Sequence, residues 1–253
     1  MTAKADFLAR IRQRVAEARS SSVGELAERP AHPAEMVEII RRELRERWHE
    51  TLGRFRAELE AVGGVLHRAA TMAEVPGVIG RLARERGAQR VIGWHPDALG
   101  ADWSAPLGAA GLDVEHMPPG EMGDERDREA LRRRIADADI GLTGADLAVA
   151  ETGSLILISG SGRPRSTSLL PACHVAVFGR SALVESLAQV GVFLEAWHGD
   201  AAPAWKGGAI NVITGPSRTA DIELTLTRGV HGPKELHAIF VEGEAFPGGE
   251  RRG

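Results

Sequence analysis

The sequence predicts an α/β fold: a mixed, mainly parallel sheet flanked by helices, with an N-terminal helical extension. From Gly63 onward, short apolar runs alternate with helical patterns, which is typical of parallel strands joined by crossover helices. The 253 residues, 43% of them hydrophobic and 26% charged, suit one large domain with a sizeable core. Before Gly63, a linker rich in Ser and Pro and an amphipathic stripe indicate the helical extension.

The extension is expected to hold two helices, over residues 4–20 and about 34–62. Apolar residues recur every three or four positions along the second helix, so one apolar stripe lies on a surface rich in Arg and Glu. The stripe can pack on the main domain or on a partner chain, which leaves a homo-oligomer open. The chain is therefore divided into the extension (1–62), an α/β domain (63–243) and a tail expected to be disordered (244–253).

Within the α/β domain, strands and helices are assigned from apolar periodicity and turn residues. Strands are expected at residues 64–69, 90–94, 113–117, 145–150, 154–159, 174–178, 209–214, 222–226 and 237–241. Helices are expected at about 74–87, 124–138 and 181–190. No Gly-x-Gly-x-x-Gly follows the first strand and no Walker A sequence is present, so a dinucleotide or P-loop site is not predicted.

Charge and composition exclude several functional classes. The net charge of -4 with mixed signs argues against non-specific nucleic-acid binding, which needs a clustered basic face. The N-terminus carries charges throughout and lacks the apolar region of a signal peptide, and no run approaches the roughly 18 apolar residues of a membrane helix. We therefore expect a cytoplasmic protein. Its one cysteine, Cys173, can form no internal disulfide and cannot hold an iron–sulfur cluster by itself.

The first segment that could carry chemistry is Glu151-Thr-Gly-Ser, between two apolar runs. A carboxylate at such a turn could be a tuned base or a nucleophile, so Glu151 is a candidate catalytic residue, and Ser154 could donate a hydrogen bond to a substrate. The alternative is a β-turn whose glutamate caps backbone amides. The next segment, residues 159–171, holds glycines, hydroxyls and Arg163, which suit an anion site or a flexible surface loop. His174 is expected to be a core histidine.

The segment after the strand at 209–214 is the one least easily explained as a turn. Ligands of open α/β sheets collect at the carboxyl ends of strands, where Ser217, Arg218 and Thr219 could supply donors to an anion. Asp221 directly precedes the next expected strand and is a further substrate-binding candidate.

Two more candidates lie in the tight turn Gly-Val-His-Gly-Pro-Lys. His231 could act as an acid or base near neutral pH, and Lys234 could be a fixed cation, although a simple hairpin turn is the alternative. No metal site is predicted, because His231 and His237 are spaced too loosely in the sequence and have too few neighbouring ligands.

The chain resembles the LUD-domain family, specifically its lactate utilisation protein C group, over about residues 63–243. The matching segments are, in order, ADLAVAETGSLILIS, SLLPACHVAVF and INVITGPSRTADIELTLTRGVHGPKELHAIFVEG. The resemblance implies a fold similar to the NagB/RpiA/CoA-transferase group and a role in growth on lactate. It implies a subunit without clusters in an L-lactate-oxidising complex that makes pyruvate, with ferredoxin-like and cysteine-rich companion subunits that carry the iron–sulfur clusters. No cofactor is then expected on this chain itself.

A second hypothesis comes from analogy within that fold group. Some CoA transferases place a nucleophilic glutamate in a Glu-x-Gly turn, and Glu151-Thr-Gly153 is similar. The alternative function is therefore a free-standing enzyme that transfers acyl groups or CoA through Glu151, or that acts on a phosphorylated metabolite.

Overall fold

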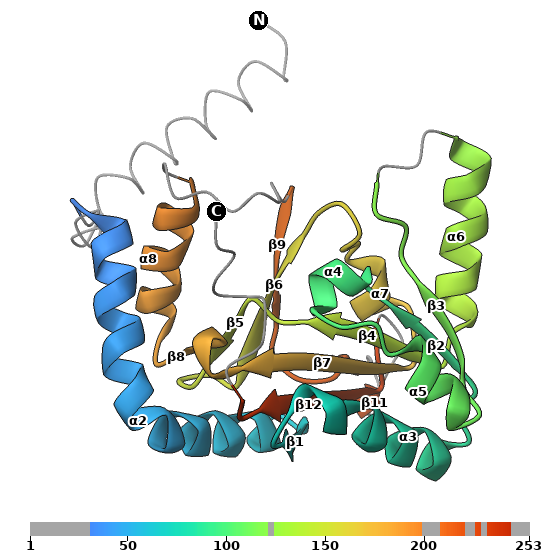
Figure 1. Ribbon diagram of the computed structural model, residues 1–253, viewed down its shortest axis with the longest axis horizontal. Coiled ribbons are helices and arrows are strands. Elements are labelled where there is room, and N and C mark those ends of the chain that lie inside the picture. The colour runs from blue at the N-terminus through green and yellow to red at the C-terminus, as the bar shows by residue number, and fades with distance from the viewer. Residues whose placement is uncertain (1–30, 121–123, 199–207, 221–225, 229–231, 244–253) are drawn as a thin grey trace, which may run out of the picture.

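The computed structural model describes residues 31–120, 124–198, 208–220, 226–228 and 232–243. Its centre is a six-stranded sheet with the order β1-β12-β7-β4-β2-β3, in which every neighbouring pair is parallel (Figure 1). These strands are β1 (Val65–Ala69), β2 (Arg90–Gly93), β3 (Asp113–His116), β4 (Ile140–Gly144), β7 (Cys173–Gly179) and β12 (Glu235–Val241). The expected α/β class is thus confirmed.

Helices cover both faces of this sheet. Successive strand residues point to opposite faces, so Phe178 and Glu235 mark the two sides. On the first side, the ring of Phe55 in α2 (Pro33–Ala61) lies 5.3 Å from the ring of Phe178. On the second side, Arg86 at the end of α3 (Val75–Arg86) hydrogen-bonds to Glu235. The remaining α-helices are α4 (Pro96–Leu99), α5 (Ser104–Ala109), α6 (Glu125–Asp137), α7 (Ser166–Leu169) and α8 (Leu187–His198).

A second, four-stranded sheet has the order β8-β5-β6-β9, in which β6 is antiparallel to both neighbours and β5 is parallel to β8. Its strands are β5 (Leu147–Val149), β6 (Ser154–Ser159), β8 (Leu183–Val184) and β9 (Ala209–Ile213). A separate two-stranded ribbon joins β10 (Arg218–Ala220) and β11 (Leu226–Arg228), and the short 3₁₀ turns are η1 (Met72–Glu74) and η2 (Arg180–Ala182).

Helix α2 joins the two sheets. The apolar positions in its first half pack with Phe193 of α8 and Ile156 of β6, whereas Phe55 and Leu59 of its second half belong to the core of the parallel sheet. The apolar stripe of this helix therefore packs on its own chain. Burial of such a stripe is the main source of stability for a helix in water. The division of the chain at residue 62 remains a prediction.

Two expected elements differ from the structure, and others lie outside the described residues. The strand expected at 145–150 is the shorter β5 at Leu147–Val149, and β4, directly before it, was not expected. The helix expected at 181–190 begins only at Leu187, after η2 and β8. Most of the strand expected at 222–226 lies outside the described residues, as do the helix expected at 4–20 and the tail. Within the described ranges, no helix is both long enough and apolar enough to span a bilayer.

Candidate functional site at the amino ends of the central strands

The Glu-Thr-Gly-Ser turn lies against the last turn of α2. Gly153 has a φ of 62°, and a Cβ at this position would lie 2.3 Å from the backbone nitrogen of Leu59. Only glycine therefore fits between the turn and the helix. The hydroxyl of Ser154 is buried and lies 2.6 Å from that of Thr214, at the end of β9. The turn and the segment after β9 are thus brought together, and Ser154 is used in this contact.

Glu151, the candidate catalytic carboxylate, is exposed at the same turn. Its Oε2 accepts a hydrogen bond of 3.0 Å from the backbone nitrogen of Leu187, the first residue of α8. A carboxylate beside the amino end of a helix pairs with amides that have no partner within the helix, and it interacts favourably with the helix dipole. This contact is what the capping interpretation of Glu151 predicts.

Arg218 lies at the other side of the α2 terminus. Its guanidinium donates a hydrogen bond to the backbone carbonyl of Val62, the residue that caps α2. A cation at the carboxyl end of a helix is stabilising for the same electrostatic reason, with opposite sign. Next to it, the backbone nitrogen of Ser217 donates to the carbonyl of Pro233 at 2.8 Å. The two glycine- and proline-containing segments singled out in the sequence are therefore neighbours.

Lys234 lies next to this contact, directly after Pro233. Its side chain is exposed, and its backbone nitrogen donates to the carbonyl of Ala172, directly before β7. Lys234 itself directly precedes β12. The sequence placed Ser217 and Arg218 after one strand and Lys234 before another, and they follow β9 and precede β12. Their contacts with Val62, Pro233 and Ala172 also set them at the amino ends of β1, β12 and β7 in the parallel sheet.

Arg163 lies elsewhere, beyond the carboxyl end of β2. Its Nη2 lies 2.7 and 2.5 Å from the two carboxylate oxygens of Asp146, and both side chains are almost fully buried. Its guanidinium also stacks 4.5 Å from the ring centre of Trp94, which follows β2. The structure therefore does not bring Arg163 together with Lys234, because parallel strands place these residues at opposite edges of the sheet.

Three candidates cannot be placed fully. Thr219 belongs to β10, but its side chain is not described. Asp221 and His231 lie outside the described residues.

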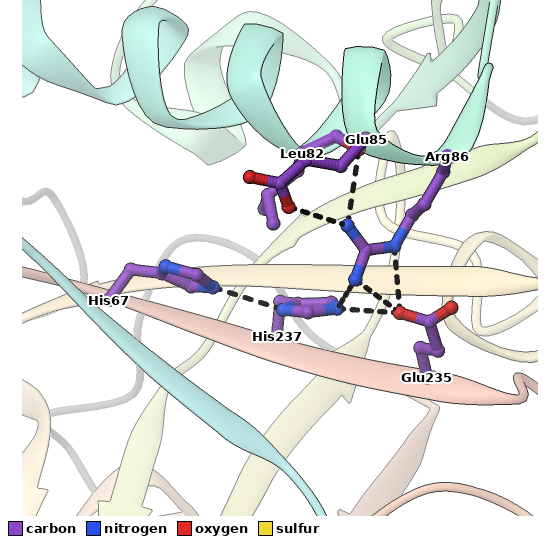
Figure 2. Close-up of polar contacts among 6 residues, drawn as sticks. All are labelled: His67, Leu82, Glu85, Arg86, Glu235 and His237. Carbon is purple, nitrogen blue, oxygen red and sulfur yellow. Dashed lines mark hydrogen bonds and ion pairs between the residues drawn. The ribbon is translucent and has the colours of Figure 1, made fainter.

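A polar cluster that the sequence did not indicate lies beside the predicted segments, under the end of α3 (Figure 2). Glu235 and Cys173 are the first residues of β12 and β7 and are partners in the parallel ladder. His237 follows two positions later on the same face, and His67 approaches it from β1. Arg86 reaches the cluster from the last turn of α3.

Hydrogen bonds fix the arrangement of this cluster. Both Nε and Nη2 of Arg86 donate to Oε2 of Glu235, the first at 2.7 Å, and Nη2 also lies 3.0 Å from Nε2 of His237. Nε2 of His237 also lies 3.0 Å from Oε2 of Glu235, so this nitrogen faces one group that only donates and one that only accepts. Nδ1 of His237 lies 3.0 Å from Nε2 of His67, and the tautomer decides which of the two imidazoles donates.

Burial and the charge of Arg86 set the protonation of the cluster. Burial, with help from neighbouring His237 and the arginines, lowers the pKa of His67 to about 4. Burial also lowers the pKa of His237, although Glu235 opposes the shift. Burial raises the pKa of the Cys173 thiol to about 12. For Glu235, burial disfavours the charged form, but the hydrogen bonds and charge of Arg86 outweigh it and lower the pKa. At neutral pH the cluster is one ion pair beside two neutral imidazoles and a thiol.

The cluster is open on one side. The Glu235 side chain is 45% exposed and that of Arg86 24%, whereas that of His237 is 3% exposed. Solvent and small solutes therefore meet the ion pair first, and the imidazoles and the thiol lie behind it. Fixed donors and acceptors of this kind can hold a small ion or pass a proton.

His174, expected to be a core histidine, is indeed fully buried on the opposite face of the sheet. Its Nε2 lies 2.9 Å from the hydroxyl of Thr143, and burial lowers its pKa to about 3, so it is neutral.

Comparison with known proteins gives consistent matches. The family model of the LUD domain matches residues 52–241. Lactate utilization protein C of Halalkalibacterium halodurans is 43% identical over 124 residues, 48% of this chain and 52% of the relative. The protein of that name from Shouchella clausii is 33% identical over 161 residues, 62% of this chain and 64% of the relative. The chain thus matches about half to just under two thirds of the length of these relatives.

One solved structure is also similar. The crystal structure of a DUF162 family protein from Deinococcus radiodurans superposes with a TM-score of 0.50 and 25% identity. The match covers 76% of this chain and 97% of that protein.

Proposed function

Because this chain belongs to the LUD-domain family, we propose that it takes part in lactate utilisation, as the subunit without clusters of an L-lactate-oxidising complex. The observation that carries the proposal is the similarity, at 33–43% identity, to relatives named lactate utilization protein C. The reaction converts lactate to pyruvate and releases two electrons and two protons. A protein of this type has to work with partners that accept those electrons.

The cysteine content supports a division of labour. The chain has one cysteine, Cys173, which is buried and whose pKa is raised by burial to about 12. Iron–sulfur clusters are typically held by about four thiolates. In the proposal, the clusters therefore belong to companion subunits, one ferredoxin-like and one cysteine-rich, and this chain binds the substrate or organises the complex.

The amino edge of the parallel sheet is the surface we assign to that task. Lys234 and Arg218 are exposed there. The backbone of Ser217, next to Arg218, is hydrogen-bonded to that of Pro233, next to Lys234. A lysine ammonium and a guanidinium are suited to a small carboxylate such as lactate, or to an acidic surface of a companion subunit. Arg163 is not included, because Asp146 already neutralises it in the interior.

Growth of a deletion strain tests the proposal. A strain without this protein should fail to grow on L-lactate, grow normally on pyruvate, and recover on lactate when the intact chain is restored. A Lys234→Ala/Arg218→Ala double variant should restore growth poorly, while Arg128→Ala, a change on the solvent face of α6, should restore it fully. Normal growth of the deletion strain on L-lactate would contradict the lactate role.

The transferase alternative makes a separate prediction. The capping contact of Glu151 with Leu187 accounts for this glutamate without a covalent role. We expect mass spectrometry after incubation with acyl-CoA to find the Glu151 peptide unmodified. A covalent adduct on that peptide would favour the transferase instead.

A further inference from the structure

We propose that Cys173, Glu235 and His237 form a binding site for a divalent cation of the zinc class. One ligand atom from each residue lies within 4.8 Å of those of the other two. The inference is independent of the lactate role, because it depends only on the cluster under the end of α3 (Figure 2).

The ligand types select the class of cation. A thiolate, an imidazole and a carboxylate are the groups that bind zinc in proteins, whereas calcium and magnesium take oxygen ligands. Three protein ligands are the number found where a zinc ion keeps a fourth position for water or another small ligand. The site would therefore hold a cation with an exchangeable position.

The distances are compatible with such an ion. Ligands of a tetrahedral zinc ion at about 2.0–2.3 Å stand roughly 3.3–3.8 Å from one another. Oε2 of Glu235 and Nε2 of His237 already lie 3.0 Å apart. All three ligand atoms fall within 4.8 Å of one another, so side-chain rotation would have to bring them to these separations when the ion binds.

The backbone holds the three residues in place. Cys173 pairs with Glu235 in the parallel ladder, and Val175 pairs with His237 one step further along the same face. Both strands are internal to the sheet, with β1 beside β12 and β4 beside β7. Ligands on adjacent internal strands lose little further freedom when an ion binds.

His67 supplies the support that a metal-bound histidine needs. A ligating imidazole almost always donates its other N–H to a second group, which fixes its tautomer and ring orientation. Nδ1 of His237 lies 3.0 Å from Nε2 of His67, so His67 can accept a proton from Nδ1 and stabilise the tautomer whose Nε2 carries none. This is the tautomer that binds a cation through Nε2.

Arg86 is the competitor for the same position. Its Nη2 reaches both Oε2 of Glu235 and Nε2 of His237, which is the place where the cation would be. Its Nε also bonds Oε2 of Glu235, so the guanidinium can withdraw from His237 and still hold the carboxylate. Oε2 would then bind the cation while it still accepts from Nε of Arg86. Because Glu235 is 45% exposed, the ion has a path to the site from solvent.

Cobalt(II) titration of the full-length chain, stripped of metal with a chelator, tests the proposal. We expect one equivalent of Co²⁺ to bind and to produce a sulfur-to-cobalt charge-transfer band in the near ultraviolet. The chain has a single cysteine, so this band can arise only from Cys173. Zn²⁺ should displace Co²⁺ and abolish the band.

Variants separate this site from adventitious binding. Cys173→Ser should abolish the band, and His237→Gln should weaken Co²⁺ binding at least tenfold. His198→Gln, which changes an exposed histidine at the end of α8, should leave binding unchanged. Arg86→Gln should strengthen binding at least tenfold, because it removes a competing positive charge. Circular dichroism checks that each variant is folded.

Three results would overturn the proposal. The first is a folded parent chain that shows no charge-transfer band with Co²⁺. The second is a band that appears only in Arg86→Gln, because the native chain would then keep Arg86 in place of the cation. The third is a folded His237→Gln chain that binds Co²⁺ as tightly as the parent.

Discussion

Replacing Arg163 by methionine should destabilise the protein strongly, because it leaves a buried carboxylate without its counter-ion. The side chains of Arg163 and Asp146 are 7% and 3% exposed. Asp146 keeps only part of its compensation, a hydrogen bond of 2.7 Å from the backbone nitrogen of Ile158. Removing one partner of a buried ion pair typically costs about 3–5 kcal/mol, and this is a large fraction of the roughly 5–15 kcal/mol that stabilises a domain.

Urea unfolding at pH 7, followed by circular dichroism, measures this loss. We expect Arg163→Met to lower the free energy of unfolding by about 3–5 kcal/mol with little change in the denaturant slope. The matched control is Arg47→Met, since Arg47 pairs with Glu185 at the surface with side chains 49% and 35% exposed. Its cost should be below about 1 kcal/mol.

A double-mutant cycle identifies the cause. When Asp146→Asn has already removed the negative charge, Arg163→Met should cost at least about 1 kcal/mol less than it does alone. The structural role of Arg163 would be refuted if Arg163→Met cost no more than Arg47→Met. The sequence-based prediction that Arg163 binds a substrate anion would then be the alternative to test.

Three further predictions concern stability. Buried His174 has a pKa of about 3, and unfolding restores its ordinary pKa of about 6.5. Below pH 6.5 the unfolded state therefore binds more protons than the folded state. The free energy of unfolding then falls as the pH drops towards 3. This residue lowers the free energy of unfolding by about 2 kcal/mol at pH 5. In urea unfolding, His174→Gln should therefore lose about 2 kcal/mol less than the parent between pH 7 and pH 5. Equal losses would contradict a buried, neutral His174. Gly153→Ala should cost at least about 2 kcal/mol, because the new Cβ meets the backbone of α2, whereas Gly87→Ala, at a φ of 64° in open space, should cost only about 1 kcal/mol; similar thermal shifts for both would argue against the clash. Glu151→Ala should cost about 1 kcal/mol through the lost cap of α8, and an unchanged urea midpoint would speak against capping.

Much of the fold could be predicted because most strands carry their own signal. The run Ser154–Ser159, for example, is apolar, short and bounded by turn residues, and it forms β6. Strand β4 has no such signal, since Gly141 and Gly144 interrupt its apolar pattern although all five of its residues are buried. A Cβ on Gly141 would lie 1.9 Å from the carbonyl oxygen of Thr167. The close approach of α7 requires this glycine, and a partner that distant in the sequence leaves no local pattern.

The candidate site shows the same limit. Glu151 and Ser154 lie in a turn between two apolar runs and Lys234 in a turn with glycine and proline, and such turns are recognisable locally. The cluster under α3 was missed because parallel pairing brings His67 to His237 from 170 residues away. The only local trace is the spacing of two between Glu235 and His237, which places them on one face of a strand.

Lactate-dependent dye reduction by the reconstituted complex tests the central claim most directly. The companion subunits would be purified and assayed with L-lactate and an artificial electron acceptor, first without this chain and then with increasing amounts of it. We expect dye reduction to depend on the chain, to saturate at a fixed ratio to the companions, and to fall when the Lys234→Ala/Arg218→Ala variant replaces the parent. Full dye reduction by the companions alone, unchanged when the chain is added, would contradict the proposed role.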